Sequence, residues 1–188
     1  MPEKNDKNLK INIEIILKLF YANKFNKAID ILNNVSMNYP NEPILYNIKG
    51  ACFAGIGDEK NAIKSYEQAI RLDPSYAKAY YNLAGILHDL KNYNSSISSY
   101  KKTIYLESNN AEAQNNLGNV YRDIKQDNLA ISFYEKAINI NPNYVEAWFS
   151  LGKVQETLRN LDSALKSYIK VLEVKPKDIG ILFRVGDD

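Results

Sequence analysis

The chain has 188 residues, of which 45% are hydrophobic and 24% are charged, and its 24 Lys and Arg against 22 Asp and Glu leave a net charge of +2. This composition is that of a folded protein, because disordered chains are poorer in apolar and aromatic residues. The near balance of charge, with no long run of one sign, predicts neither a nucleic-acid nor a membrane-surface partner.

The N-terminal segment, residues 1–8, is polar and mixed in charge, and we predict it to be a tail. The apolar stretch that follows, residues 11–20, carries Glu14 and Lys18. This pattern indicates an amphipathic helix and excludes a signal peptide or a membrane span. We therefore expect the protein to stay in the cytoplasm.

Prolines recur along the chain at a fixed interval. Pro40, Pro74, Pro142 and Pro176 are separated by 34, 68 and 34 residues, and the missing member of the series falls on Ser108. Regular spacing of this kind is the signature of a repeat protein. The spacing predicts five copies of a 34-residue unit: 9–42, 43–76, 77–110, 111–144 and 145–178.

Small and large residues keep the same register as the prolines. Two small columns consist of Gly50, Ala84, Gly118 and Gly152, and of Ala28, Ala62, Ser96, Ala130 and Ala164. Two large columns consist of Tyr46, Tyr80 and Trp148, and of Tyr66, Tyr100, Tyr134 and Tyr168. Small residues let two helices approach closely and large ones fill the space beside them. Each unit is therefore predicted to be a helical hairpin.

A short polar break separates the two helices of each hairpin. Asp58, Asn94, Asn128 and Asp162 are predicted to cap the second helices, because short polar side chains accept a hydrogen bond from a helix N-terminus. The proline at the end of the unit stops the second helix.

These columns resemble the tetratricopeptide repeat, whose pattern is an aromatic, Leu and Gly, Tyr, Ala, an aromatic, Ala and Pro. Unit 111–144 carries the pattern as Leu117, Gly118, Tyr121, Ala130, Tyr134, Ala137 and Pro142. Unit 9–42 keeps only Ala28 and Pro40, which is expected of a terminal capping repeat. The resemblance implies an all-α fold, a right-handed α-α superhelix of stacked antiparallel helix pairs.

The last ten residues, 179–188, start the pattern again. Leu182, Val185 and Gly186 fall in the columns of Trp148, Leu151 and Gly152. This segment is predicted to be the start of a truncated sixth unit or a minimal cap. We favour truncation of a longer protein, because a finished array usually closes with a helix whose outer face is polar.

The resemblance also implies that the first helices line a concave groove where partners bind. Carried onto this chain, the groove residues are Asn47, Lys78, Tyr81, Asn82, His88, Asp89, Glu112, Asn115, Asn116, Asn119, Arg122, Asp123, Phe149 and Lys153. Asn115 and Asn119 stand one turn apart on the side that packing is expected to leave free. Their amides can pair with an extended peptide backbone, so replacing both by Ala should weaken partner binding and leave melting nearly unchanged.

The expected partner is a protein or peptide. Some members of the family bind the C-terminal tail of chaperones through a clamp of Lys, Arg and Asn, but the matching columns hold Glu112 and Glu146. Chaperone-tail binding is therefore disfavoured. The groove wall of the last three units is mildly acidic, which favours a neutral or basic peptide.

Few residues suggest chemistry. The single cysteine, Cys52, and the single histidine, His88, exclude a disulfide and most His or Cys metal sites. His88 and Asp89 are adjacent in a predicted helix and point about 100° apart, which is unsuited to a catalytic pair. We expect no catalytic residue, no cofactor and no metal.

The predicted function is a non-catalytic scaffold for protein–protein interaction that binds a peptide or partner subunit in the groove. The alternative is the repeat arm of a longer enzyme, a glycosyltransferase resembling the O-linked N-acetylglucosaminyltransferases or a sulfotransferase, with a catalytic domain outside this chain. Asn82 and Asn116, one repeat apart, form a short ladder of the kind found in those glycosyltransferases.

Overall fold

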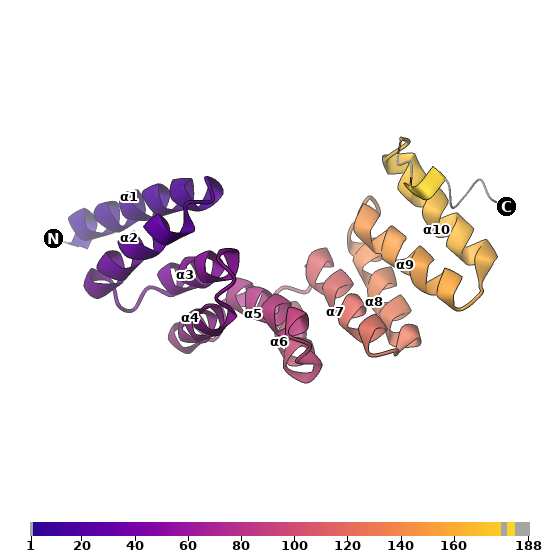
Figure 1. Ribbon diagram of the computed structural model, residues 1–188, viewed down its shortest axis with the longest axis horizontal. Helices are drawn as coiled ribbons and strands as arrows, with labels where there is room; N and C mark the ends of the chain where they lie inside the picture. The colour runs from indigo at the N-terminus through magenta and orange to yellow at the C-terminus, as the bar shows by residue number, and fades with distance from the viewer. Residues whose placement is uncertain (1, 178–179, 183–188) are drawn as a thin grey trace. The chain divides into compact units, whose positions relative to one another are not determined.

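The computed structural model describes residues 2–177 and 180–182, and the side chains from residue 7 onward. All of the regular elements in this part of the chain are α-helices (Figure 1). Their bounds are α1 Pro2–Tyr21, α2 Phe25–Asn38, α3 Pro43–Gly55, α4 Glu59–Leu72, α5 Ala77–Asp89, α6 Tyr93–Leu106, α7 Ala111–Asp123, α8 Asp127–Ile140, α9 Val145–Thr157 and α10 Leu161–Val174. The predicted all-α fold class of paired helices is confirmed.

The helices recur with the period of the prolines. Helices α3, α5, α7 and α9 begin at residues 43, 77, 111 and 145, which are 34 residues apart. Helices α4, α6, α8 and α10 begin at residues 59, 93, 127 and 161, with the same interval. Helix α6 ends at Leu106 although Ser108 replaces the proline, so the other residues of the repeat suffice to end it.

The chain divides into two compact units, Met1–Lys91 and Asn92–Asp188, and the division falls between α5 and α6. In the first unit α2 packs against α1 and α3, and α4 packs against α3 and α5. In the second unit α7 packs against α6, α8 and α9, and α10 packs against α9. Each of these helices therefore covers one side of its neighbour in sequence.

Glycine–tyrosine contacts close the hairpins. A Cβ atom at Gly118 would lie 2.6 Å from Cε1 of Tyr134, and the same 2.6 Å separates Gly152 from Tyr168 and Gly50 from a ring carbon of Tyr66. No side chain fits at that separation, so the tyrosine ring lies directly on the glycine backbone. The prediction that large residues fill the space beside the small ones is confirmed for these three hairpins.

The aromatic residues of the first helices also hold the preceding turns. The Trp148 indole Nε1 donates to the carbonyl of Pro142 at 2.8 Å, and the Tyr46 hydroxyl donates to the carbonyl of Pro40 at 3.1 Å. The same bond therefore joins the turn to the next helix in two different repeats.

The capping prediction is correct at one helix and wrong at three. Asp58 accepts from the backbone N–H of Asn61 at 3.1 Å and caps α4. Helix α6 is capped by Asn92, and α8 and α10 begin after Gln126 and Asn160 without a side-chain cap. Asn94, Asn128 and Asp162 therefore lie inside the first turns of their helices.

The reason for the shift is the conformation of the turn. Lys91, Lys125 and Arg159 have φ values of 59°, 62° and 59°. A left-handed residue ends a helix within one step and reverses the chain. The second helices consequently begin two residues earlier than the capping pattern predicts.

The two ends of the chain extend the description. The predicted tail at residues 1–8 is wrong for residues 2–8, which form the first two turns of α1; Pro2 and Glu3 suit the first turn of a helix. In the predicted sixth unit, Val185 and Gly186 lie outside the described residues, whereas Ile181 is buried in a cluster with Val145, Tyr168 and Val171. Among the described residues no helix is both long and apolar enough to cross a membrane.

Candidate functional site

The predicted groove residues lie on the first helices of both units. The first unit holds Asn47 on α3 and Lys78, Tyr81, Asn82, His88 and Asp89 on α5. The second unit holds Glu112, Asn115, Asn116, Asn119, Arg122 and Asp123 on α7, and Phe149 and Lys153 on α9. The two sets are described separately below.

In the first unit, two asparagines join neighbouring first helices. Asn82 Nδ2 donates to Asn47 Oδ1 at 3.0 Å, and Asn47 is buried. The Tyr76 side chain also hydrogen-bonds Asn47, although burial, the larger effect, raises the pKa of the Tyr76 hydroxyl. These contacts give Asn47 a structural role between α3 and α5.

The remaining predicted residues of the first unit are more accessible. The Lys78 ammonium lies 4.8 Å from the centre of the Tyr81 ring, a cation–π contact. His88 is half-buried and Asp89 is exposed at the end of α5. The structure brings Lys78 and Tyr81 together as a basic and aromatic pair.

In the second unit, Asn115 is not accessible. Its residue exposure is 4%, its Nδ2 donates to Asn116 Oδ1 at 3.3 Å, and its buried Oδ1 has no partner among the described residues. Helix α7 is covered by α6, α8 and α9, so less of its polar side remains open than a single hairpin would leave. The expectation that packing leaves Asn115 free is wrong.

Asn119 is half-buried and fixed by two donors. Its Oδ1 accepts from the Tyr134 hydroxyl at 2.9 Å and from Arg122 Nη1 at 3.3 Å. Tyr134 is 0% exposed, and this burial raises its pKa to about 12, so the hydroxyl stays protonated and can donate. With Oδ1 occupied on one side, Nδ2 of Asn119 has no partner among the described residues.

Sequence reasoning places Tyr134 in the core and does not anticipate its hydroxyl bond. Tyr134 lies on α8, and its hydroxyl reaches Asn119 on α7 and also hydrogen-bonds the side chain of Ser150 on α9. A tyrosine rather than phenylalanine in a buried column is the one signal in the sequence for such a polar contact, because a buried hydroxyl needs a partner.

Charged and aromatic side chains surround Asn119. Arg122 pairs with Asp123 at 3.0 Å, and both side chains are about one-third exposed. On α9 the Lys153 ammonium lies 5.6 Å from the centre of the Phe149 ring. We call Asn116, Asn119, Arg122, Phe149 and Lys153 the α7–α9 surface.

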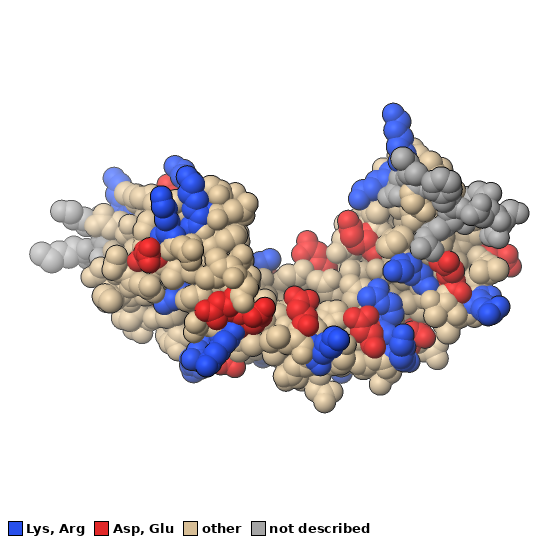
Figure 2. All heavy atoms as spheres, viewed as in Figure 1, with Lys and Arg blue, Asp and Glu red and all other residues tan. Residues whose placement is uncertain are grey.

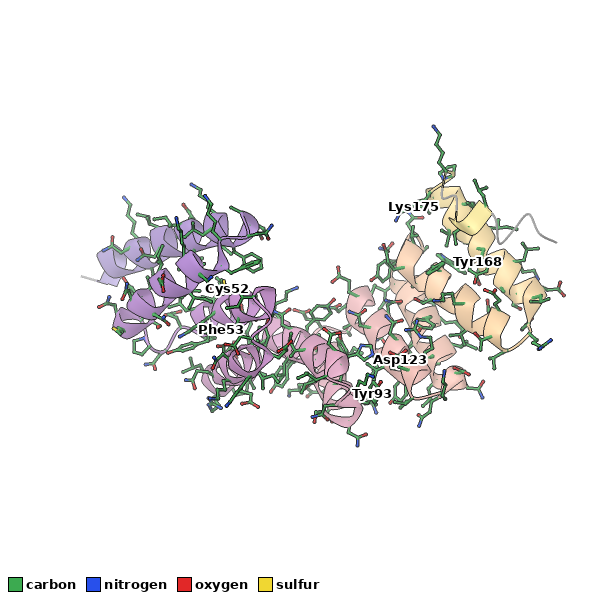
Figure 3. All side chains as sticks on the ribbon, viewed as in Figure 1. Cys52, Phe53, Tyr93, Asp123, Tyr168 and Lys175 are labelled. Carbon is green, nitrogen blue, oxygen red and sulfur yellow. The ribbon has the colours of Figure 1, made fainter. Side chains whose placement is uncertain are left out.

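Helix α10 supports α9 from the other side. Tyr168, labelled in Figure 3, stacks obliquely on Phe149 with ring centres 6.2 Å apart. Its hydroxyl donates to Glu156 Oε2 at 2.6 Å. The aromatic ring of Phe149 is thus held in place by a buried tyrosine.

The candidates for chemistry lack the required environment. Cys52 is buried, and that burial raises the pKa of its thiol to about 11, so little reactive thiolate exists at neutral pH. Among the described residues no group of three or more His, Cys, Asp or Glu side chains could hold a metal ion.

Two family models match the chain over its repeats. The model described as TPR repeat matches residues 56–90 and 118–158, and the model described as tetratricopeptide repeat matches residues 77–110 and 145–178. Together the matched segments span more than half of the chain.

Curated relatives share only part of their length with this chain. The peroxisomal targeting signal receptor of Kluyveromyces lactis is 40% identical over 67 residues, which is 35% of this chain and 12% of the receptor. The chain therefore matches only a small part of that protein.

Solved structures match over most of the chain. The crystal structure of MamA is 29% identical, with a TM-score of 0.78 over 87% of this chain and 95% of MamA. The pilF protein of Pseudomonas aeruginosa is 18% identical, with a TM-score of 0.87 over 96% of this chain and 82% of pilF, a likeness of fold alone.

Proposed function

This chain belongs to the tetratricopeptide repeat family, and we propose on that premise that it is a non-catalytic scaffold that binds a peptide or partner subunit. The binding site proposed is the α7–α9 surface. A receptor for a targeting signal among the relatives supports a protein or peptide as the ligand.

The observation that carries the proposal is the fixed amide of Asn119. Tyr134 and Arg122 both donate to its Oδ1, which leaves Nδ2 as a donor of set orientation. A donor that is held before binding loses little conformational entropy when an acceptor arrives. Backbone carbonyl groups of an extended peptide are acceptors of this kind, whatever the side chains of the peptide.

The neighbouring side chains suit a peptide with mixed character. Phe149, with Lys153 over its ring, offers an aromatic face for an apolar side chain. Arg122 is paired with Asp123, so the guanidinium is partly neutralised. Figure 2 shows acidic and basic side chains interspersed over the visible face of the second unit. This balance supports a neutral or basic peptide rather than a strongly acidic one.

The test exploits the two ends of the Asn119 amide. Asn119→Asp keeps an oxygen for the Tyr134 hydroxyl and for Arg122 but removes the Nδ2 donor. We expect this variant to melt near the parent temperature and to capture less partner from a native lysate, measured by mass spectrometry against the parent chain.

The matched control is Asn139→Asp, which makes the same change of charge at an exposed position of α8. It should capture partner as the parent chain does. Equal capture by the parent and by Asn119→Asp would remove the α7–α9 surface from consideration as the binding site.

A further inference from the structure

A surface hollow lies in the second unit at the turns α6–α7 and α8–α9. Its volume is about 730 Å³, enough for a long side chain, and none of the described residues that line it is Lys or Arg. Leu106, Ile140 and Tyr144 give it apolar walls, and Glu107, Glu112 and Asn141 give it polar ones. The hollow thus combines apolar surface with carboxylates.

The electrostatic character of the hollow is negative. Glu107 accepts from Asn110 Nδ2 at 2.8 Å, which holds the carboxylate in the turn, and Glu112 is exposed in the first turn of α7. The C-terminal ends of α6 and α8, at Leu106 and Ile140, contribute partial negative charge from their last carbonyls. The N-terminal end of α7 has the opposite sign, and Glu112 offsets it.

The next repeat shows what this place in the frame accepts. Glu146 and Lys175 stand 34 residues after Glu112 and Asn141, and the Lys175 ammonium lies 3.8 Å from the Glu146 carboxylate. Figure 3 labels Lys175 at the end of α10. In that repeat the chain supplies its own cation beside the glutamate, whereas in the repeat before it the same position is the neutral Asn141.

We propose that this hollow receives a Lys or Arg side chain of the bound partner. The methylene groups lie against Leu106, Ile140 and Tyr144, and the cationic head reaches Glu107 and Glu112. Long basic side chains have this division into an apolar stem and a charged end. The proposal rests on the function proposed above, because it gives a basic residue of the peptide a second site beside the α7–α9 surface.

The experiment uses a probe that needs no partner. N-acetyl-arginine amide is titrated into the full chain labelled with ¹⁵N, and its neutral isostere N-acetyl-citrulline amide serves as the control. We expect saturable shifts of the backbone amide signals of residues 107–112 and 140–144 with the arginine probe only. Equal shifts with both probes, or shifts confined to other parts of the chain, would overturn the proposal.

A pair of variants tests whether the cation position itself matters. Asn141→Lys places an ammonium where Lys175 stands in the next repeat, and the backbone suits the change because φ is −133° at Asn141 and −123° at Lys175. Asn143→Lys adds the same charge to the same turn outside the lining. We expect Asn141→Lys to weaken arginine binding about tenfold by occupying the site, with a much smaller effect of Asn143→Lys.

Equal weakening by the two lysine variants would contradict the proposal, because it would indicate a general charge effect. The outcome is distinct from that of the Asn119 experiment. Should Asn119→Asp lose the partner while the arginine probe fails to bind, the hollow alone is refuted and the α7–α9 surface stands.

Discussion

The close contact of Gly118 with Tyr134 makes Gly118→Ala a sensitive probe of the packing. The added Cβ would lie 2.6 Å and 2.8 Å from two ring carbons of Tyr134 and 3.2 Å from the carbonyl oxygen of Ala130. The ring is fully buried and its hydroxyl is bonded to Asn119, so it cannot swing aside. One methyl group therefore forces either the ring or the helix backbone to move.

The magnitude follows from three effects. Overpacking at such a rigid site costs about 3 kcal/mol, the upper end of the usual range. Disturbing the Tyr134 hydrogen bond costs about 1 kcal/mol more. Alanine is a better helix former than glycine by about 1 kcal/mol, which offsets part of the loss. We expect a net loss of about 3 kcal/mol and a melting temperature lower by roughly 6–12 °C.

The assay is urea and thermal unfolding followed by far-UV circular dichroism, in the parent chain and in a Tyr134→Ala background. Without the ring the overlap disappears, so Gly118→Ala should there be neutral or slightly stabilising. The difference between the two backgrounds measures the contact itself. An equal cost in both backgrounds, or a single variant that melts like the parent, would refute the packing of the hairpin.

Three further outcomes follow from the structure. Asn119→Ala should lower the free energy of unfolding by about 1–3 kcal/mol, because it leaves the buried Tyr134 hydroxyl short of an acceptor; an unchanged urea midpoint would contradict that bond. Burial lowers the pKa of Lys49, so the unfolded chain binds more protons and stability should rise with pH between the lowered pKa and the ordinary value near 10.5. Lys49→Met should abolish that rise and stabilise the chain by up to about 1 kcal/mol, and a variant that melts lower than the parent would argue against a desolvated amine. The Cys52 thiol should resist iodoacetamide at about pH 8 until urea unfolds the chain, and rapid labelling of the native protein would show that the thiol is accessible.

Much of the fold is readable from the sequence because each repeat constrains the same positions. Gly118 and Tyr134 stand in columns of small and large residues, and their contact is the one that the columns predict. The periodicity of the prolines likewise predicts where α3, α5, α7 and α9 begin. These features depend on residue size and chain direction, which a repeated pattern records directly.

Features that depend on atomic reach are not readable in the same way. The shifted N-termini of α6, α8 and α10 follow from a left-handed residue in each turn, and Lys91, Lys125 and Arg159 carry no glycine-like signal in the sequence. These positions are decided by backbone geometry rather than by side-chain type.

The candidate site shows the same limit. The pattern places Asn115 and Asn119 one turn apart on a polar side of α7, but the structure buries the first and bonds the second to Tyr134. The separation of α7 from α8 and α9 determines both results, and a repeat register does not specify that separation to within a hydrogen-bond length. Replacing both asparagines by Ala is therefore expected to reduce stability as well as partner binding, contrary to the expectation from sequence.

Hydrogen–deuterium exchange of the chain with and without its captured partner tests the central claim most directly. If the partner lies on the α7–α9 surface, exchange should slow in residues 111–123 and 145–157, with little change in the outer helices at 127–140 and 161–174. Protection that falls only on those outer helices would contradict the assignment of the binding surface to α7 and α9.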